Sequence, residues 1–143
     1  MYSRRPKESH RDTIAYETDM LGFCGQALIT SEYPTPEDMY VYLEAFLLHY
    51  RNLTRVFSGE NHRRDDLSTA DAVAWAGRGM TPEETALIRT RAQELDAKYF
   101  EQISKYLQHC TQLRHDHDRG WDVKIMLNEI SPIIEAFELA FPR

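Results

Sequence analysis

Cysteine and long apolar runs are scarce in this chain. Among its 143 residues only Cys24 and Cys110 are cysteines, and neither has a CxxC partner. We therefore expect two buried, reduced thiols and a reducing compartment rather than a disulfide framework. No stretch approaches the roughly 20 apolar residues that a membrane span requires, and the polar, basic segment 1–11 has no apolar core like that of a signal peptide. These absences predict a cytoplasmic protein with no membrane partner.

Positive charge is also in short supply. Seventeen lysines and arginines stand against 23 acidic residues, which gives a formal net charge of −6. This balance argues against a surface that holds nucleic acid throughout, and it leaves a local basic patch open. A hydrophobic content of 42%, with 11% aromatic residues, excludes general disorder. No segment alternates between apolar and polar with a period of two, so no sheet is predicted.

The most informative segment is a predicted helix from Thr35 to Phe57. It begins with a hydroxyl at the N-cap, a proline at the first helical position and two acids in the first turn. Apolar residues recur along it at alternating steps of four and three, and a second apolar stripe, interrupted by Asn52, runs beside the first. The first stripe consists of Met39, Leu43, Phe46, Tyr50, Leu53 and Phe57, and the second of Val41, Ala45, Leu48 and Val56. A helix that is apolar on two sides belongs in the centre of a bundle or in an oligomer interface, and we expect a homodimer through it.

The remaining elements are also helical. Residues 1–12 predict a flexible basic tail, and residues 13–143 predict a single bundle domain whose first helix runs from Thr13 to about Ser31. Gly22 and Gly25 weaken this helix, but as small residues they can let another helix approach closely.

The second half of the chain repeats the same helical pattern. Thr81-Pro82-Glu83-Glu84 is a capping box that starts either one long helix over 82–118 or two in line, and Gly120 follows as a stop signal. A last helix starts near Asp122, and Pro132 predicts a kink or a break in it. The fold class is therefore all-α: four or five helices in a mostly antiparallel up-down bundle, with a long crossover at 58–80 after the second helix. This crossover is expected to be a lid or a connection, with room for a short helix.

Polar residues at the edges of the apolar stripes are candidates for chemistry. His49 and Asn52 lie beside Phe46 on the central helix, and His109 has the same kind of edge position on the long one. Two histidines facing one seam can divide general acid and base roles without a metal, and the alternative is that each satisfies a buried carbonyl. Arg51 and Arg55, one turn apart, indicate either an anion site or a solvated face with cross-helix ion pairs.

A second histidine cluster stands at the end of the long helix. It consists of His109, His115, Asp116, His117 and Asp118. Such residues can bind zinc, and a metal-binding bundle enzyme that also uses His49 is the alternative function. However, His115 and His117 are about 160° apart around a helix axis and cannot converge from one face. An exposed helix end is the preferred interpretation, so we expect no metal and no cofactor.

Two segments together resemble a known group of proteins. The stretch Tyr42 to Leu53 ends in His-Tyr-Arg-Asn-Leu, and Ile103 to Thr111 carries lysine and histidine four positions apart, at Lys105 and His109. With Trp121 and the final amphipathic helix, this order is similar to that of small bacterial proteins related to the HEPN (higher eukaryotes and prokaryotes nucleotide-binding) superfamily. The resemblance covers roughly Asp38 to Phe141.

The resemblance implies a helical bundle that often dimerises and has RNA or a nucleotide as ligand. Active members are metal-independent ribonucleases, many of them toxins or phage-defence effectors, so an antitoxin-like protein partner is also implied. Arg51 would hold the scissile phosphate, a histidine would activate the ribose 2′-hydroxyl, and Asn52 would orient it. From these positions together with the resemblance, the catalytic candidates are His49, Arg51, Asn52 and His109, and the substrate-binding candidates are Arg55 and Arg114.

The chain departs from the family pattern at one place. The family's histidine follows its arginine after four to six positions, and here those positions hold Val56, Phe57 and Ser58. Two functions therefore stay open: a weak metal-independent ribonuclease and a catalytically silent bundle that acts through a protein partner. In the ribonuclease, the missing histidine would be replaced by His109 or by His62 acting with Arg55. We prefer the silent bundle, because the histidine is missing and the net charge is acidic.

Overall fold

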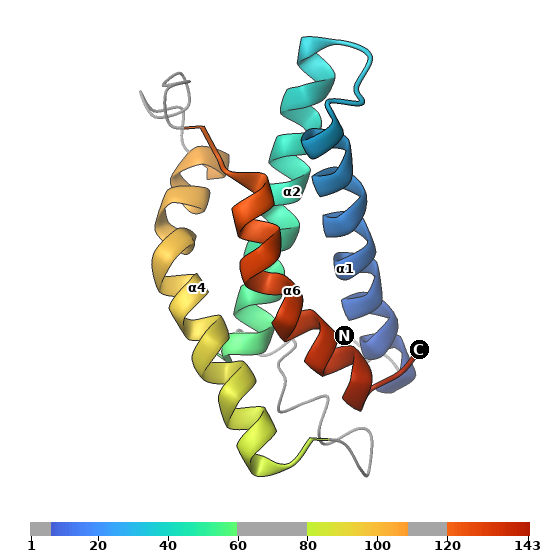
Figure 1. Ribbon diagram of the computed structural model, residues 1–143, viewed down its shortest axis with the longest axis vertical. Helices are drawn as coiled ribbons and strands as arrows, with labels where there is room; N and C mark the ends of the chain where they lie inside the picture. The colour runs from blue at the N-terminus through green and yellow to red at the C-terminus, as the bar shows by residue number, and fades with distance from the viewer. Residues whose placement is uncertain (1–6, 60–79, 109–119) are drawn as a thin grey trace, which may run out of the picture.

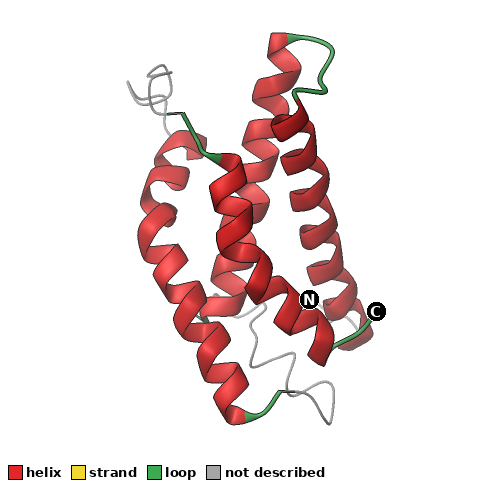
Figure 2. Ribbon diagram, in the orientation of Figure 1, coloured by secondary structure: helices red, strands yellow, loops and turns green. Residues whose placement is uncertain are grey.

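The computed structural model describes residues 7–59, 80–108 and 120–143. These residues form four helices and no strand: α1 (Lys7–Thr30), α2 (Pro36–Ser58), α4 (Pro82–Gln108) and α6 (Val123–Ala140). The helices run alternately up and down, with consecutive helices antiparallel (Figures 1 and 2). The predicted all-α antiparallel bundle is confirmed. Most of the crossover at 58–80, and the part of 82–118 that follows Gln108, lie outside the described residues.

Both predicted proline-containing helix starts are confirmed, with reciprocal hydrogen bonds. At α2 the backbone N–H of Asp38 donates to the Thr35 hydroxyl (3.2 Å), and the N–H of Thr35 donates to the Asp38 carboxylate (3.0 Å). At α4 the N–H of Glu84 donates to the Thr81 hydroxyl (3.2 Å), and the N–H of Thr81 donates to the Glu84 carboxylate (3.1 Å). These bonds satisfy amide groups that the first helical turn leaves without intrahelical partners. At its other end, α2 stops at Gly59, whose φ of 70° lies in the left-handed region.

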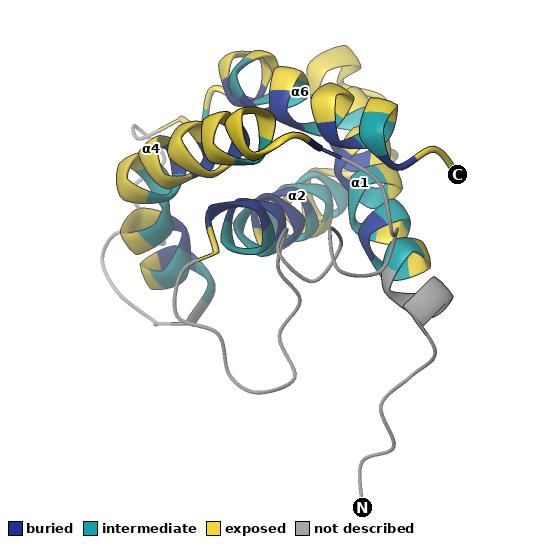
Figure 3. Cartoon of the chain, turned by 90° about the horizontal axis from the view of Figure 1, so that it is seen from below, coloured by how far each residue is buried: buried dark blue, intermediate teal, exposed yellow. Residues whose placement is uncertain are grey.

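The α2 helix is the centre of the bundle. It packs between α1 and α4, and α6 lies across one side of it (Figure 3). The first predicted stripe is the core: Phe46, Tyr50, Leu53 and Phe57 are 0% exposed. The second stripe is not covered in the same way, because Val41 is 64% and Leu48 38% exposed. Within one chain the second stripe is thus covered only in part: Val41 and Leu48 lie at the surface, whereas Ala45 and Val56 are half-buried against the core.

The N-terminal helix begins earlier than its sequence pattern predicts. α1 starts at Lys7 rather than Thr13, so residues 7–12, assigned to a flexible tail, are helical. Arg11 supplies the physical reason: its Nε donates to the carbonyl of Phe141 (2.7 Å), and its guanidinium lies 5.3 Å from the centre of the Phe137 ring. The N-terminal part of α1 is therefore tied at Arg11 to the C-terminal end of α6, a contact that local periodicity does not reveal.

The structure confirms the prediction for Gly25 but not for Gly22, and it shows one continuous helix around Pro132. A Cβ at Gly25 would lie 2.7 Å from Leu127 Cδ1 of α6 and 3.2 Å from the Phe46 ring, so the predicted close helix approach is confirmed there. Gly22 has nothing within 4 Å and serves no such approach. Pro132 does not break α6, which is one helix whose ribbon changes direction partway along (Figure 1). Of the helices described, none has the length and apolar character needed to cross a membrane.

Candidate functional site

A partly buried polar cluster joins α1 to α2. His49 is 7% exposed, and its Nδ1 lies 2.5 Å from Oε2 of Glu17. The amide nitrogen of Asn52, one turn further along α2, donates to both oxygens of the same carboxylate at 3.3 Å. The predicted edge positions of His49 and Asn52 are thus brought together by a residue that sequence analysis did not select. A signal for it exists: Glu17 lies between Ile14 and Leu21 on the buried stripe of α1, where an acid needs a polar partner.

The geometry of this cluster defines what it can do chemically. A carboxylate at Nδ1 favours the tautomer that carries its proton there, which leaves Nε2 as the acceptor in the neutral ring. The Tyr16 ring meets the imidazole edge-on, with ring centres 5.7 Å apart. The cluster can therefore orient a general base at the α1–α2 seam. The same cluster also gives three polar side chains their hydrogen-bond partners and links α1 to α2. Such a purely structural role for His49 is the alternative that the sequence analysis left open.

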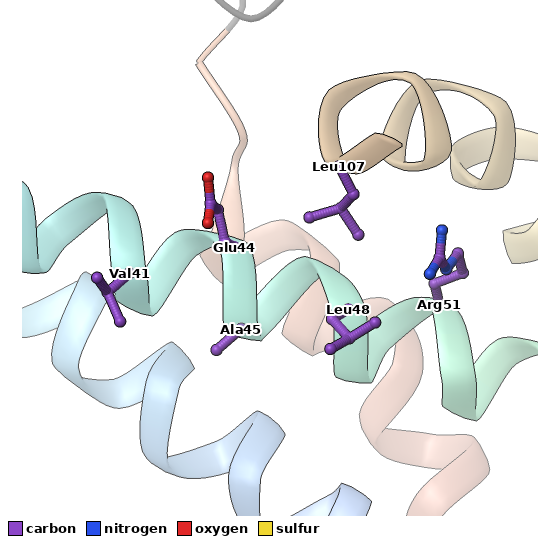
Figure 4. Close-up of a pocket in the computed structure, with 6 residues that line it drawn as sticks. All are labelled: Val41, Glu44, Ala45, Leu48, Arg51 and Leu107. Carbon is purple, nitrogen blue, oxygen red and sulfur yellow. The ribbon is translucent and has the colours of Figure 1, made fainter. Parts of the chain in front are cut away.

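Arg51 lies on a different side of α2. Two positions along a helix correspond to about 200° around its axis, so the Arg51 and His49 side chains leave α2 in nearly opposite directions. Arg51 Nη1 donates to the Ser104 hydroxyl of α4 (3.4 Å). Its guanidinium borders a hollow of about 420 Å³ on the surface of α2, together with Leu107 of α4 (Figure 4). The other lining residues are Val41, Glu44, Ala45 and Leu48.

The electrostatic surroundings of Arg51 favour an anionic ligand or partner. Burial lowers the pKa of its guanidinium, and the nearby charge of Arg55 lowers it further. The group nevertheless stays charged at neutral pH, because arginine titrates far above it. Among the described residues no carboxylate forms an ion pair with Arg51. A partly buried cation without a described counter-ion is a ready contact for a phosphate or a carboxylate from outside.

Arg55, predicted to bind substrate, is engaged within the bundle. Its Nε lies 3.1 Å from Oδ1 of Asp96 on α4. Its guanidinium also lies 3.5 Å from the centre of the Phe100 ring, a close cation–π contact. This placement agrees with the alternative interpretation of Arg55, a cross-helix ion pair.

The other predicted site residues are not described. His109 and Arg114 lie outside the described residues, as do His115, Asp116, His117, Asp118 and Cys110. Within residues 7–59, 80–108 and 120–143, no three His, Cys, Asp or Glu side chains are placed to hold a metal ion. Cys24, the cysteine that is described, is a buried free thiol, as predicted.

Comparisons with known proteins bring no relative. No family model matches the chain, and searches of curated proteins and of solved structures find no match either.

Proposed function

We propose that this chain is a HEPN-like, RNA- or nucleotide-associated bundle that is catalytically silent and acts by association. The observation that carries this proposal is the divergence of its two best catalytic candidates. His49 turns toward α1 and is held by Glu17, whereas Arg51 turns toward the surface hollow and Ser104. A phosphodiester in contact with the Arg51 guanidinium is therefore remote from the His49 imidazole, and general acid–base catalysis needs both groups within hydrogen-bond reach.

The proposal includes a homodimer and a protein partner. The apolar residues that α2 leaves at the surface, Val41 and Leu48 above all, support self-association, because exposed apolar patches mark interaction sites. The free thiol of Cys24 supports a cytoplasmic location. An antitoxin-like partner within a toxin–antitoxin or phage-defence system rests on the family resemblance and on the absence of the family's histidine at Val56 to Ser58.

A second candidate function, a weak metal-independent ribonuclease, is favoured by Arg51 itself. Its guanidinium stands at the rim of an open hollow, has no described counter-ion and is chemically suited to a phosphate. In such an enzyme, His109 would have to supply the imidazole that His49 does not bring to this side of α2.

Incubation of total transfer RNA with the purified protein in excess EDTA tests the proposal. The wild type, Arg51→Ala, His49→Ala and His109→Ala are compared for cleavage, and RNA binding is measured in parallel by gel shift. We expect no cleavage by any of the four, and weaker RNA binding by Arg51→Ala alone. Cleavage by the wild type that Arg51→Ala and His109→Ala abolish would refute the silent bundle and establish the ribonuclease.

A further inference from the structure

The hollow between α2 and α4 combines an accessible cation with apolar side chains. Arg51 donates to Ser104 through Nη1 and, among the described residues, has no other hydrogen-bond partner. None of its nitrogens is buried without a partner, so its remaining N–H groups reach the surface. Apart from Glu44, the other lining residues are apolar: Val41, Ala45, Leu48 and Leu107. A mostly apolar lining with a few polar groups that fix orientation is typical of small-ligand sites, and the volume of about 420 Å³ is in their range.

The two charged residues at the hollow give it a direction. Glu44 and Arg51 are seven residues apart, about 10 Å along the axis of α2, and Figure 4 shows Leu107 reaching from α4 toward α2 between them. Glu44 has an interaction within the chain, so it acts on a ligand only through its charge. That charge repels phosphate at one end of the hollow, whereas Arg51 attracts phosphate at the other. A nucleotide in the hollow therefore has its phosphate at Arg51 and its base toward Leu107.

The same composition favours an unpaired strand over a duplex. Proteins contact duplex RNA mainly through its phosphates and 2′-hydroxyls, because the bases are stacked inside the helix. Arg55, the next cation along α2, is held by Asp96 (3.1 Å) and lies against the Phe100 ring. The apolar side chains of the hollow would have no partner in a duplex backbone. They do have one in an unpaired base, whose flat face can be covered by apolar side chains.

Two leucines are placed to contact such a base. Leu48 lies three residues before Arg51, about 60° around the helix and about 5 Å along it. Leu107 is half-buried and lies one turn after Ser104, the residue of α4 that Arg51 contacts. Leu48 also supports the homodimer, together with Val41, whereas Leu107 belongs to a different helix and has no part in that argument. Leu107 is therefore the position at which base binding can be tested on its own.

We propose that the hollow binds one nucleotide of a single-stranded RNA, with its phosphate on Arg51 and its unpaired base between Leu107 and Leu48. This inference rests on the RNA association of the proposed function and adds to it the strand state of the RNA and the position of the base. It needs no catalytic group, and the His49 side chain leaves α2 in nearly the opposite direction from Arg51. The site thus agrees with a bundle that is catalytically silent.

Fluorescence anisotropy with a short labelled RNA strand tests the base contact. The comparison strands are an abasic one with the same number of phosphates and a duplex of the same sequence. With the wild type, removal of the bases should raise the Kd by about fourfold or more, the effect of losing one methylene-sized apolar contact. Leu107→Ala should raise the Kd of the intact strand by a similar factor and leave that of the abasic strand unchanged. Its matched control, Leu87→Ala, makes the same change at a 51% exposed position on the opposite side of α4, and should alter neither Kd.

The salt dependence of binding tests the phosphate contact separately. Each phosphate of a single strand that a protein neutralises contributes about −0.7 to the slope of log Kobs against log salt. Arg51→Ala should therefore flatten this slope by about 0.7 for the intact and the abasic strand alike. Arg51→Lys keeps the charge and should keep the slope. Arg91→Ala, which removes an exposed arginine on the far side of α4, should also leave the slope unchanged.

The possible failures can be told apart. A wild-type protein that binds none of these RNAs would overturn the RNA association and this site with it, and would leave a carboxylate of a protein partner as the anion for Arg51. Binding that depends on Arg51 but is equally tight for intact, abasic and duplex RNA would keep the RNA association and overturn the base site. A Leu107→Ala variant that weakens the intact and the abasic strand equally would also overturn it.

Two controls keep this test decisive. The comparison of intact with abasic RNA uses the wild-type chain, so its result does not depend on whether Leu107→Ala folds. Circular dichroism and sedimentation equilibrium of each variant show whether a weaker Kd reflects a lost contact, a lost fold or a lost dimer.

Discussion

Tyr50 places a hydroxyl in the core without a hydrogen bond to a described residue. It is 0% exposed, and burial raises its pKa above the ordinary value. Removing this hydroxyl in Tyr50→Phe keeps the ring contact with Tyr99, whose centre is 5.5 Å away. We expect the free energy of unfolding to rise by about 1 kcal/mol, because a buried unpaired hydroxyl carries a desolvation cost of that order.

Tyr99→Phe is the matched control for this prediction. The Tyr99 hydroxyl donates to Glu129 at 2.5 Å, so the same chemical change removes a hydrogen bond to a charged acceptor and should cost about 2 kcal/mol. Urea denaturation of the wild type and both variants gives the comparison. A Tyr50→Phe variant that loses as much stability as Tyr99→Phe would show that the Tyr50 hydroxyl has a hydrogen-bond partner in solution.

Single residues also show where reasoning from sequence stops. The edge positions of His49 and Asn52 follow from helical periodicity, and both are found there. Their common partner, Glu17, lies 32 residues before His49, and no spacing rule links residues that meet only when α1 packs on α2. Arg51 and Arg55 look equivalent in sequence, since they stand one turn apart. Asp96 and Phe100 of α4 distinguish them, because they engage Arg55 and leave Arg51 at the hollow.

The bounds and buried faces of single helices are easier to predict from the sequence than the contacts between helices. The starts of α2 and α4 and the buried stripe of α2 follow from residues within a few positions of one another, where capping and periodicity operate. The start of α1 does not, because Arg11 is held by the carbonyl of Phe141 at the end of α6, a contact between residues 130 positions apart. The same limit applies to the second stripe of α2, since apolar periodicity shows that a face needs cover and does not show which chain provides it.

The two glycines of α1 give a prediction at the level of the helix. Gly22 faces open space, so Gly22→Ala should stabilise the protein by about 1 kcal/mol, the difference in helix propensity. Gly25→Ala has the same propensity gain, but its methyl would lie 2.7 Å from Leu127 and 3.2 Å from Phe46. Overpacking costs about 1–3 kcal/mol, so this variant should be no more stable than the wild type.

Thermal and urea unfolding of the two variants side by side measures the packing contribution of Gly25. Both substitutions are in the same helix and make the same chemical change, so their difference removes the propensity term. Equal stabilisation by both would contradict the close approach of α1 to α6 at Gly25.

At the scale of the whole molecule, ion pairs of Arg143 join the residues after α6 to the middle of α1. Arg143 donates to both oxygens of Asp19 on α1, at 2.8 and 2.7 Å, and also to Glu138 (3.0 Å). Together with Arg11 and the Phe141 carbonyl, these bonds hold the end of α6 against residues 11–19 of α1. The bundle is therefore closed between its first and last helices, although α1 and α6 are the pair most distant in sequence.

The ion pair between Asp19 and Arg143 predicts that the stability of the fold decreases at acidic pH. The hydrogen bonds from Arg143 lower the pKa of Asp19, so its contribution to stability is present above the unfolded-state pKa, about 4, and is lost as the pH falls through the folded-state pKa. Asp19 is 59% exposed, so solvent screening limits the contribution to about 0.5 kcal/mol, or roughly 2 °C in Tm.

Melting curves of the wild type and Asp19→Asn between pH 7 and about pH 2 test this closure, because both proteins carry a neutral group at position 19 once Asp19 is protonated. The variant should melt lower at pH 7, and the difference should vanish at the acidic end and shrink in high salt. Asp12→Asn, an exposed acid on the same helix with no ion pair among the described residues, should show no such difference. If Asp19→Asn instead lowered the Tm by the same amount at every pH, the amide would be disturbing the packing of α1. The charge of Asp19 would then not contribute to the contact with Arg143.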